Sequence, residues 1–341
     1  MPEAMRPRLS ASPRALAVTA LALAAGIAVA LVVAGRAQTP TLIPREAYDH
    51  PGQLVTLPDG RRLNFRCVGE GSPTVILEAG FSSWSFAWGK VQARLAPVTR
   101  ACAYDRAGYG FSDPGPLPRD GAAIARDLDR GLRAAHINGP YVLVGHSAGG
   151  LYQRLFAARR RSDVVGLVFV DSSVEHQTEK FAAMFGRDAG NATEGMRRKR
   201  TACLEIVQAP AQGSEAERTA CEAFFKPGPP GLWLKPAVWN SEISELDTLF
   251  DKTSEQVDRT DGLLKDIPAI VLTAGDADGA PEGPQDPGAQ AWQLLHKELA
   301  GRFTHSREQL VKSGHLMMNE RPEVISAAAL ELVAKARKRR P

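Results

Sequence analysis

The sequence lacks the charge excess and the clustered ligand residues that identify several classes of protein. Its 42 Lys and Arg against 38 Asp and Glu leave a net charge of +4, of which residues 1–37 carry +3 with four Arg and one Glu. The remaining charge of about +1 gives no basic footprint for nucleic acid. No Cys and His cluster has zinc-ligand spacing and no phosphate-binding loop is visible, so neither a metal nor another cofactor is expected.

Cysteine is also scarce, with four residues in 341, at positions 67, 102, 203 and 221. An even number suits pairing in an oxidising compartment, and buried free thiols are the alternative. If the cysteines are paired, the protein is expected to be secreted or to face the outside of the cytoplasm.

The N-terminal segment agrees with export. Three arginines precede an apolar run over residues 15–34, which is long enough to span a bilayer. Gly35-Arg36-Ala37 also suits signal cleavage, so residues 1–37 are a signal peptide or a membrane anchor, and both remain open. In either case the arginines keep the N-terminus in the cytoplasm and predict that the rest is periplasmic or extracellular.

A nucleophile on a sharp turn is indicated near the middle of the chain. An apolar run over residues 141–144 is typical of a buried strand, and it leads into Gly145-His146-Ser147-Ala148-Gly149-Gly150, after which a helical pattern begins. A strand-to-helix turn this tight needs small residues beside the serine. It also places the serine hydroxyl at the positive end of the next helix. Ser147 is therefore the candidate nucleophile.

Two further motifs accompany this turn, Tyr104-Asp105-Arg106-Ala107-Gly108-Tyr109-Gly110-Phe111-Ser112 and Ser313-Gly314-His315. With them the sequence resembles the α/β-hydrolase superfamily, in particular its lidded, esterase-like serine hydrolases, over about residues 53–333 apart from a divergent middle. The resemblance implies an α/β fold with a mostly parallel eight-stranded sheet flanked by helices, and a helical lid inserted after strand six. The expected organisation is a linker at 38–52, a first core part at 53–171, the lid at 172–265 and a second core part at 266–341.

Hydrophobic patterning assigns positions to these elements. Residues 122–135 predict an amphipathic helix with Ile124, Leu128 and Leu132 on one face, and residues 292–299 and 323–336 are also helical in pattern. The expected strands are 54–57, 62–68, 74–77, 99–104, 141–144, 164–170, 268–273 and 307–311.

A serine hydroxyl needs a base, and His315 is the candidate because it follows the last strand, at the same edge of a parallel sheet as Ser147. A carboxylate must orient the imidazole. Asp278, after strand seven, stands where most relatives carry that acid and is the first choice. Asp171, at the end of strand six, is the alternative that some lidded relatives use, and Asp276 is a weaker third choice.

The resemblance also implies an oxyanion hole. In related hydrolases the loop after the 74–77 strand is rich in His and Gly and gives one backbone N–H; here Ala79-Gly80 stands in its place. The implied donors are the amides of Phe81 and Ala148. The charged residues of the 104–112 motif are interpreted as structural.

Two disulfides and an acyl pocket complete the expectations from the resemblance. In the family's strand order Cys67 and Cys102 lie on neighbouring antiparallel strands, which allows a bridge, and Cys203 and Cys221 would then pair in the divergent middle. Lid aromatics could line an acyl pocket, or they could only pack the lid. These aromatics are Phe181, Phe185, Trp233 and Trp239.

The first functional hypothesis is an exported serine hydrolase that cleaves carboxylic esters through an acyl-enzyme, with a small-molecule ester or amide as substrate. Amide cleavage, acyl transfer or peracid formation on the same triad is the second, and a non-catalytic exported binding domain is the third. No His-Gly-Gly-Pro motif supports a proline-releasing peptidase. Serine rather than aspartate at position 147 argues against dehalogenase and epoxide-hydrolase chemistry.

Overall fold

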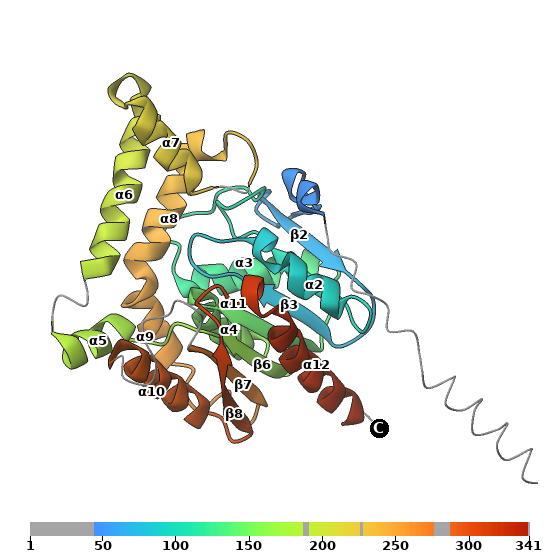
Figure 1. Cartoon of the computed structure of the whole chain (residues 1–341). Helices are drawn as coiled ribbons and strands as arrows, with labels where there is room; N and C mark the ends of the chain where they lie inside the picture. The colour runs from blue at the N-terminus through green and yellow to red at the C-terminus, as the bar shows by residue number, and fades with distance from the viewer. Residues whose placement is uncertain (1–43, 187–190, 226–227, 276–286, 340–341) are drawn as a thin grey trace, which may run out of the picture. The chain divides into compact units, whose positions relative to one another are not determined.

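Eight strands form one sheet in the computed structural model, which describes residues 44–186, 191–225, 228–275 and 287–339 (Figure 1). Their order across the sheet is β1-β2-β4-β3-β5-β6-β7-β8. The β1–β2 and β2–β4 pairs are antiparallel and the other pairs are parallel, so the mostly parallel eight-stranded sheet expected from the sequence is confirmed. The strands are β1 Gln53–Thr56, β2 Arg62–Val68, β3 Thr74–Glu78, β4 Ala101–Tyr104, β5 Tyr141–His146, β6 Val164–Val170, β7 Ala269–Gly275 and β8 Ser306–Lys312.

Side chains that alternate along the strands build two apolar cores, one on each face of the sheet. In β3, Ile76 belongs to one core, while Val75 and Leu77 belong to the other. Helices α3, α4 and α10 contribute to the first core, and α2, α11 and α12 contribute to the second. The helices are α2 Gly89–Leu95, α3 Gly121–Ala134, α4 Ala148–Arg159, α10 Pro287–Gly301, α11 Met317–Glu320 and α12 Pro322–Lys338.

Between β6 and β7 the chain leaves the sheet and forms a helical insertion, defined here as the segment from α5 to α9. In Figure 1, α6 and α8 run side by side to the left of the sheet. The insertion has a core of its own around Trp239, which also takes in Trp84 and Tyr109 from the loops after β3 and β4. That the insertion acts as a lid stays a prediction. Its helices are α5 Gln177–Phe185, α6 Asn191–Gln208, α7 Glu215–Ala223, α8 Pro236–Leu249 and α9 Lys252–Asp258, and short 3-10 helices lie at Arg45–Asp49, Ser85–Trp88, Pro210–Gln212 and Leu232–Leu234.

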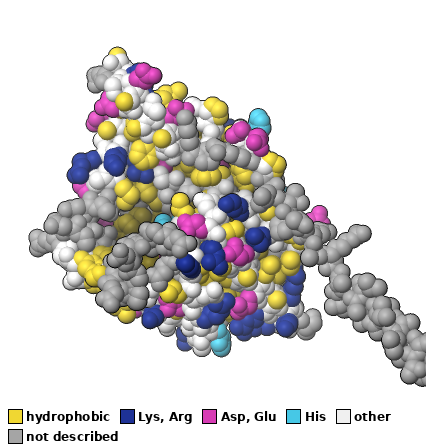
Figure 2. Space-filling model, in the orientation of Figure 1, with side chains coloured by type: hydrophobic (Ala, Val, Ile, Leu, Met, Phe, Trp, Pro, Cys, Tyr) yellow, Lys and Arg dark blue, Asp and Glu magenta, His cyan; other side chains and the backbone are white. Residues whose placement is uncertain are grey.

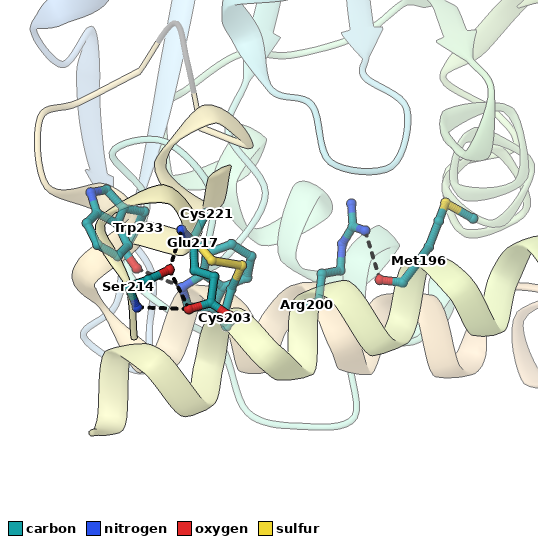
Figure 3. Close-up of a disulfide and its surroundings, with 8 residues drawn as sticks. Met196, Arg200, Cys203, Ser214, Glu217, Cys221 and Trp233 are labelled. Carbon is teal, nitrogen blue, oxygen red and sulfur yellow. Dashed lines mark hydrogen bonds between the residues drawn. A yellow bond between two sulfur atoms is a disulfide. The ribbon is translucent and has the colours of Figure 1, made fainter. Parts of the chain in front are cut away.

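Both expected disulfides are present. Cys67 and Cys102 are register partners on the antiparallel β2–β4 pair, which brings their sulfurs together across the two strands. Cys203 on α6 is bonded to Cys221 on α7 (Figure 3). Each bond therefore joins two elements, one pair in the sheet and one pair in the helical insertion.

We expect no thiol of the folded protein to be alkylated before reduction, because all four cysteines are engaged in these two bonds. Reduction in denaturant should then allow four alkyl groups to be added, which intact mass spectrometry counts. Alkylation of the unreduced protein would show that a pair is open in solution.

The predicted leader, residues 1–37, lies outside the described residues. Among the helices of the described ranges, none combines the length and hydrophobicity needed to cross a bilayer. Part of the expected linker at 38–52 forms the 3-10 helix Arg45–Asp49, in which Tyr48 is buried beneath the guanidinium of Arg66, 4.6 Å from its ring centroid.

Candidate active site

The carboxyl ends of the parallel strands carry the candidate site residues. Phe81 follows β3, Ser147 follows β5, Asp171 follows β6 and His315 follows β8. Because β3, β5 and β6 are consecutive neighbours in the sheet, their carboxyl ends meet at one edge. Asp278 and Asp276 lie outside the described residues.

Ser147 lies in a strained backbone conformation on a turn that is closely packed by its neighbours. Its φ of 51° and ψ of −128° are rare for a residue with a side chain and cost about 1–3 kcal/mol. A Cβ at Gly149 would lie 2.6 Å from the carbonyl oxygen of Glu78, and one at Gly150 would lie 1.8 Å from the Ser172 hydroxyl. The glycines are therefore required by close packing around the turn, as the sequence pattern predicted.

Two backbone N–H groups beside Ser147 are available to a ligand. Ala148 is the first residue of α4 and is fully buried, and among the described residues neither its N–H nor that of Phe81 donates to a protein acceptor. The loop that carries Phe81 lies against Ser147, since a Cβ on Gly80 would be 3.0 Å from the Ser147 Cβ. A buried N–H without a partner is rare, which makes the Ala148 amide a candidate oxyanion donor, and the partly buried Phe81 lies on the loop beside it.

His315 is paired with Asp171, the alternative acid. The Nδ1–H of His315 donates to Oδ2 of Asp171 over 2.6 Å, which leaves Nε2 as the unprotonated nitrogen of the neutral ring. The His315 side chain is 51% exposed, whereas that of Asp171 is 4% exposed. The structure thus gives the imidazole a buried carboxylate on one side and an open nitrogen on the other.

The carboxylate of Asp171 is fully engaged. Its other oxygen, Oδ1, accepts from the backbone N–H of Ala274 at 2.9 Å and from the indole N–H of Trp292 at 2.7 Å. Burial alone would raise the pKa of Asp171, but the hydrogen bond and charge of His315, together with these donors, hold that pKa below its usual value. Asp171 is therefore ionised and fixed in orientation at neutral pH.

His146, next to Ser147 in the chain, ties the loop of His315 to the serine turn. Its Nε2–H donates to the His315 carbonyl oxygen at 2.8 Å, and the centroids of the two rings are 4.6 Å apart. Burial lowers the pKa of His146 to about 3, so this ring stays neutral. These contacts give His146 a structural role, and they bring His315 beside the turn that carries Ser147.

Known proteins provide independent information on the family of this chain. The sequence matches the alpha/beta hydrolase family over residues 71–328, which is most of the chain. The chain belongs to the alpha/beta hydrolase family.

Individual proteins match this chain over a smaller part of its length or at low sequence identity. It is 34% identical over 168 residues to an uncharacterized protein of Schizosaccharomyces pombe, an alignment that takes in 41% of this chain and 31% of that one. The chain spans less than half the length of the first curated relatives that it matches. Among solved structures it is similar to an esterase from Exiguobacterium antarcticum (TM-score 0.58, 15% identity, 83% of this chain and 99% of that one). It is also similar to an epoxide hydrolase, CorEH (TM-score 0.53, 20% identity, 83% and 98%). These likenesses show the shared fold.

The sequence did not predict what supports residues 79–82, called the oxyanion loop from here on because Phe81 is the expected oxyanion donor. Arg106, fully buried, donates to the carbonyl oxygens of Ala79 at 2.7 Å and Gly80 at 2.8 Å, and it pairs with both Glu78 and Glu245. The structural interpretation of the 104–112 motif fits these contacts. The partner on α8 could not be found from local sequence, because it lies 139 positions along the chain.

Glu78 shares the one guanidinium of Arg106 with a second carboxylate. Burial raises the pKa of Glu78 to about 7, against the partly compensating charge of Arg106 and the hydrogen bond from the Tyr104 hydroxyl. A carboxyl whose pKa is raised on folding stabilises the protein below its unfolded pKa of 4.5, and this contribution is lost as pH rises to about 7. Its ionisation therefore opposes folding near neutral pH.

We expect Glu78→Gln to abolish that part of the pH dependence, because the amide keeps the shape of the carboxyl without ionising. Between pH 4.5 and 7 the unfolding free energy of the wild type should fall relative to that of the variant by on the order of 2 kcal/mol. Urea denaturation of both proteins across this range measures the difference. A difference that grows in favour of the wild type as pH rises would contradict the assignment.

We expect Gly80→Ala to damage the site more than the fold. The added methyl would lie 2.9 Å from Nδ1 of His146 and 3.0 Å from the Ser147 Cβ, so the oxyanion loop must move away from the serine. A shift of a few tenths of an ångström should lower kcat by about tenfold or more, with a small effect on KM. Steady-state kinetics with a matched melting curve test this, and an unchanged kcat would show that the loop is not aligned with the nucleophile.

Aromatic and aliphatic side chains of α5 and α10 lie close to the acid. The ring of Phe181 stacks on Trp292, the residue that donates to Asp171, and on Phe185. Met184, Phe185 and Leu316 are at least 40% exposed, and Leu316 is the neighbour of His315 in the chain. Figure 2 shows a hollow lined with hydrophobic side chains on this face, below α6 and α8. Of the aromatics considered for an acyl pocket, Trp239 instead packs in the core of the insertion.

Proposed function

We propose that this protein is an exported serine hydrolase that cleaves carboxylic esters through an acyl-enzyme. The observation that carries the proposal is the pairing of the Nδ1–H of His315 with buried Asp171, while His146 links the same histidine to the turn of Ser147. The proposed nucleophile, base and orienting acid thus follow β5, β8 and β6, three parallel strands of one sheet.

In the proposed mechanism the Ser147 hydroxyl attacks the ester carbonyl carbon while Nε2 of His315 takes its proton. The ionised Asp171 stabilises the imidazolium that forms. The N–H groups of Phe81 and Ala148 stabilise the negative oxygen, helped by the positive end of α4. The imidazolium then protonates the departing alcohol, and a water that loses its proton to His315 hydrolyses the acyl-enzyme.

Esters with apolar acyl groups fit the surroundings best. The stacked rings of Phe181 and Phe185, which reach Asp171 through Trp292, and the exposed Leu316 beside His315 provide apolar surface close to the site. Burial of each methylene group of an acyl chain against such a surface contributes about 0.8 kcal/mol. Medium-length chains should therefore be preferred over acetate.

Export is part of the same proposal. The two disulfides are stable in an oxidising compartment, which supports a catalytic domain outside the cytoplasm. Residues 15–34 would direct export as a signal peptide or hold the protein to the membrane as an anchor.

The test is the hydrolysis of p-nitrophenyl esters of increasing acyl length, compared with the matching p-nitroanilides. We expect turnover of the esters, with kcat/KM rising from acetate to medium chains, and much slower turnover of the anilides. Ser147→Ala serves as the background. Faster anilide than ester cleavage would assign the triad to amides, and no turnover of either class would overturn the proposal.

A further inference from the structure

We propose that Arg200 and Glu242, both in the helical insertion, are positioning residues that hold the Phe81 amide over Ser147. In this proposal the helical insertion helps to position a donor of the oxyanion hole. This inference rests on the proposed serine hydrolase function, because it assigns a role to residues that act on the same site.

The oxyanion loop is held on both sides of Phe81. On the side toward the sheet, Arg106 binds the carbonyl oxygens of Ala79 and Gly80. On the other side, the hydroxyl of Ser82 donates to a carboxylate oxygen of Glu242 at 2.7 Å and accepts from the guanidinium of Arg200 at 2.8 Å. The N–H of Phe81 thus lies between two anchored residues.

The second anchor acts on a strained part of the backbone. Ser82 has a φ of 60°, which a residue with a side chain rarely adopts unless its surroundings hold it there. The guanidinium of Arg200 also lies over the ring of Phe81, 4.6 Å from its centroid. Without these contacts the loop is free to relax, and the direction of the Phe81 N–H is lost.

Arg200 and Glu242 form a buried unit whose hydrogen bonds stay within the protein. Nε of Arg200 donates to Glu242 at 2.6 Å and Nη1 donates to the carbonyl oxygen of Met196, as Figure 3 shows for the latter. Their side chains are 5% and 0% exposed. A buried ion pair of this kind is weak evidence for stability, because desolvation offsets most of the attraction. Its direct bonds to Ser82 indicate a role in placing the loop.

The same two helices carry a matched control. Arg197, one turn earlier on α6, forms an exposed ion pair with Asp247 on α8, at 2.8 Å with side chains 44% and 39% exposed. This pair also joins α6 to α8. The hydrogen bonds of Arg197 go to Asp247 among the described residues, so it does not touch the oxyanion loop.

The experiment replaces each pair by apolar residues of similar size and measures kcat, KM and unfolding. For Arg200→Met with Glu242→Leu we expect kcat on a p-nitrophenyl ester to fall by roughly 10²-fold, with KM changed less than threefold. Ser82→Ala should show a similar fall, and adding it to the double variant should cause little further loss, since all three act on one loop. Arg197→Met with Asp247→Leu should stay within twofold of the wild type.

The outcomes separate this inference from the proposed function. A wild type that hydrolyses esters, together with a folded Arg200→Met, Glu242→Leu variant that keeps its kcat, would overturn the positioning role and leave the function standing. Equal losses in the two paired variants would also overturn it, because general packing of α6 on α8 would then be the cause. If the double variant does not fold, Ser82→Ala decides, and an unchanged kcat in that variant overturns the proposal. No Ser147-dependent activity in the wild type would instead refute the function.

Discussion

Ser147→Ala is expected to lower kcat for ester hydrolysis by about 10⁶-fold while the protein folds normally. The hydroxyl is the only group removed, and the glycines that accommodate the turn remain in place. His315 and the oxyanion amides cannot form an acyl-enzyme without it. Steady-state kinetics on pure protein, with far-UV circular dichroism as the folding control, measure the loss. Residual activity above about a hundredth of the wild-type value would show that another residue is the nucleophile.

The backbone conformation of residue 147 should also affect the stability of the protein. Because Ser147 lies at a φ of 51°, Ser147→Gly removes the conformational cost as well as the hydroxyl. We expect this inactive variant to unfold with a free energy about 1 kcal/mol higher than that of Ser147→Ala. An alanine variant as stable as the glycine variant would mean that the backbone relaxes when the serine is absent.

The second large effect is expected at Asp171. Asp171→Asn should lower kcat by about 10⁴-fold, because an amide in place of the carboxylate favours the wrong tautomer of His315 and no longer stabilises its cation. The donors from Ala274 and Trp292 can still be satisfied by the amide oxygen, so the fold should survive. Kinetics across pH 5–9 with a matched melting curve test both statements.

Asp278→Asn is the discriminating companion to that experiment. Asp278 was the first choice from the family pattern, while the contacts of His315 support Asp171. We therefore expect Asp278→Asn to keep a kcat within a few-fold of the wild type. A loss at Asp278 with near-normal activity in Asp171→Asn would reverse the assignment.

The strands and the serine turn could be predicted because their signals are local. The apolar run before Ser147 and the glycines after it predict a strand, a turn and a helix within about ten residues. The strands expected at 62–68 and 164–170 match β2 and β6 as observed. His315 could be assigned because a position just after the last parallel strand fixes its edge of the sheet.

The acid could not be chosen from sequence because two strand ends supply equivalent carboxylates. In the sequence Asp171 directly follows β6 and Asp278 stands three positions after β7, and the choice depends on which side chain meets Nδ1 of His315. That contact also depends on Trp292 of α10, which donates to Asp171 from 121 positions away. A periodic pattern assigns Trp292 to a helix but says nothing about the partner of its indole N–H.

The polar contacts between the sheet and the insertion could not be predicted from the sequence for a similar reason. Glu242 and Glu245 stand three positions apart on α8, a spacing that is ordinary for an exposed helix face. Both are buried, and each meets an arginine from a different part of the chain, Arg200 and Arg106. Only the packed structure shows that the two pairs converge on the loop of Phe81.

The central claim is that Ser147 is a nucleophile activated by His315, and covalent trapping tests it most directly. The full-length protein is treated with a fluorophosphonate, digested and mapped by peptide mass spectrometry, alongside His315→Ala. We predict one adduct per chain on Ser147 in the wild type, formed at least about 10³-fold more slowly in the variant. An unlabelled Ser147, or one labelled equally fast without the imidazole, would contradict the claim.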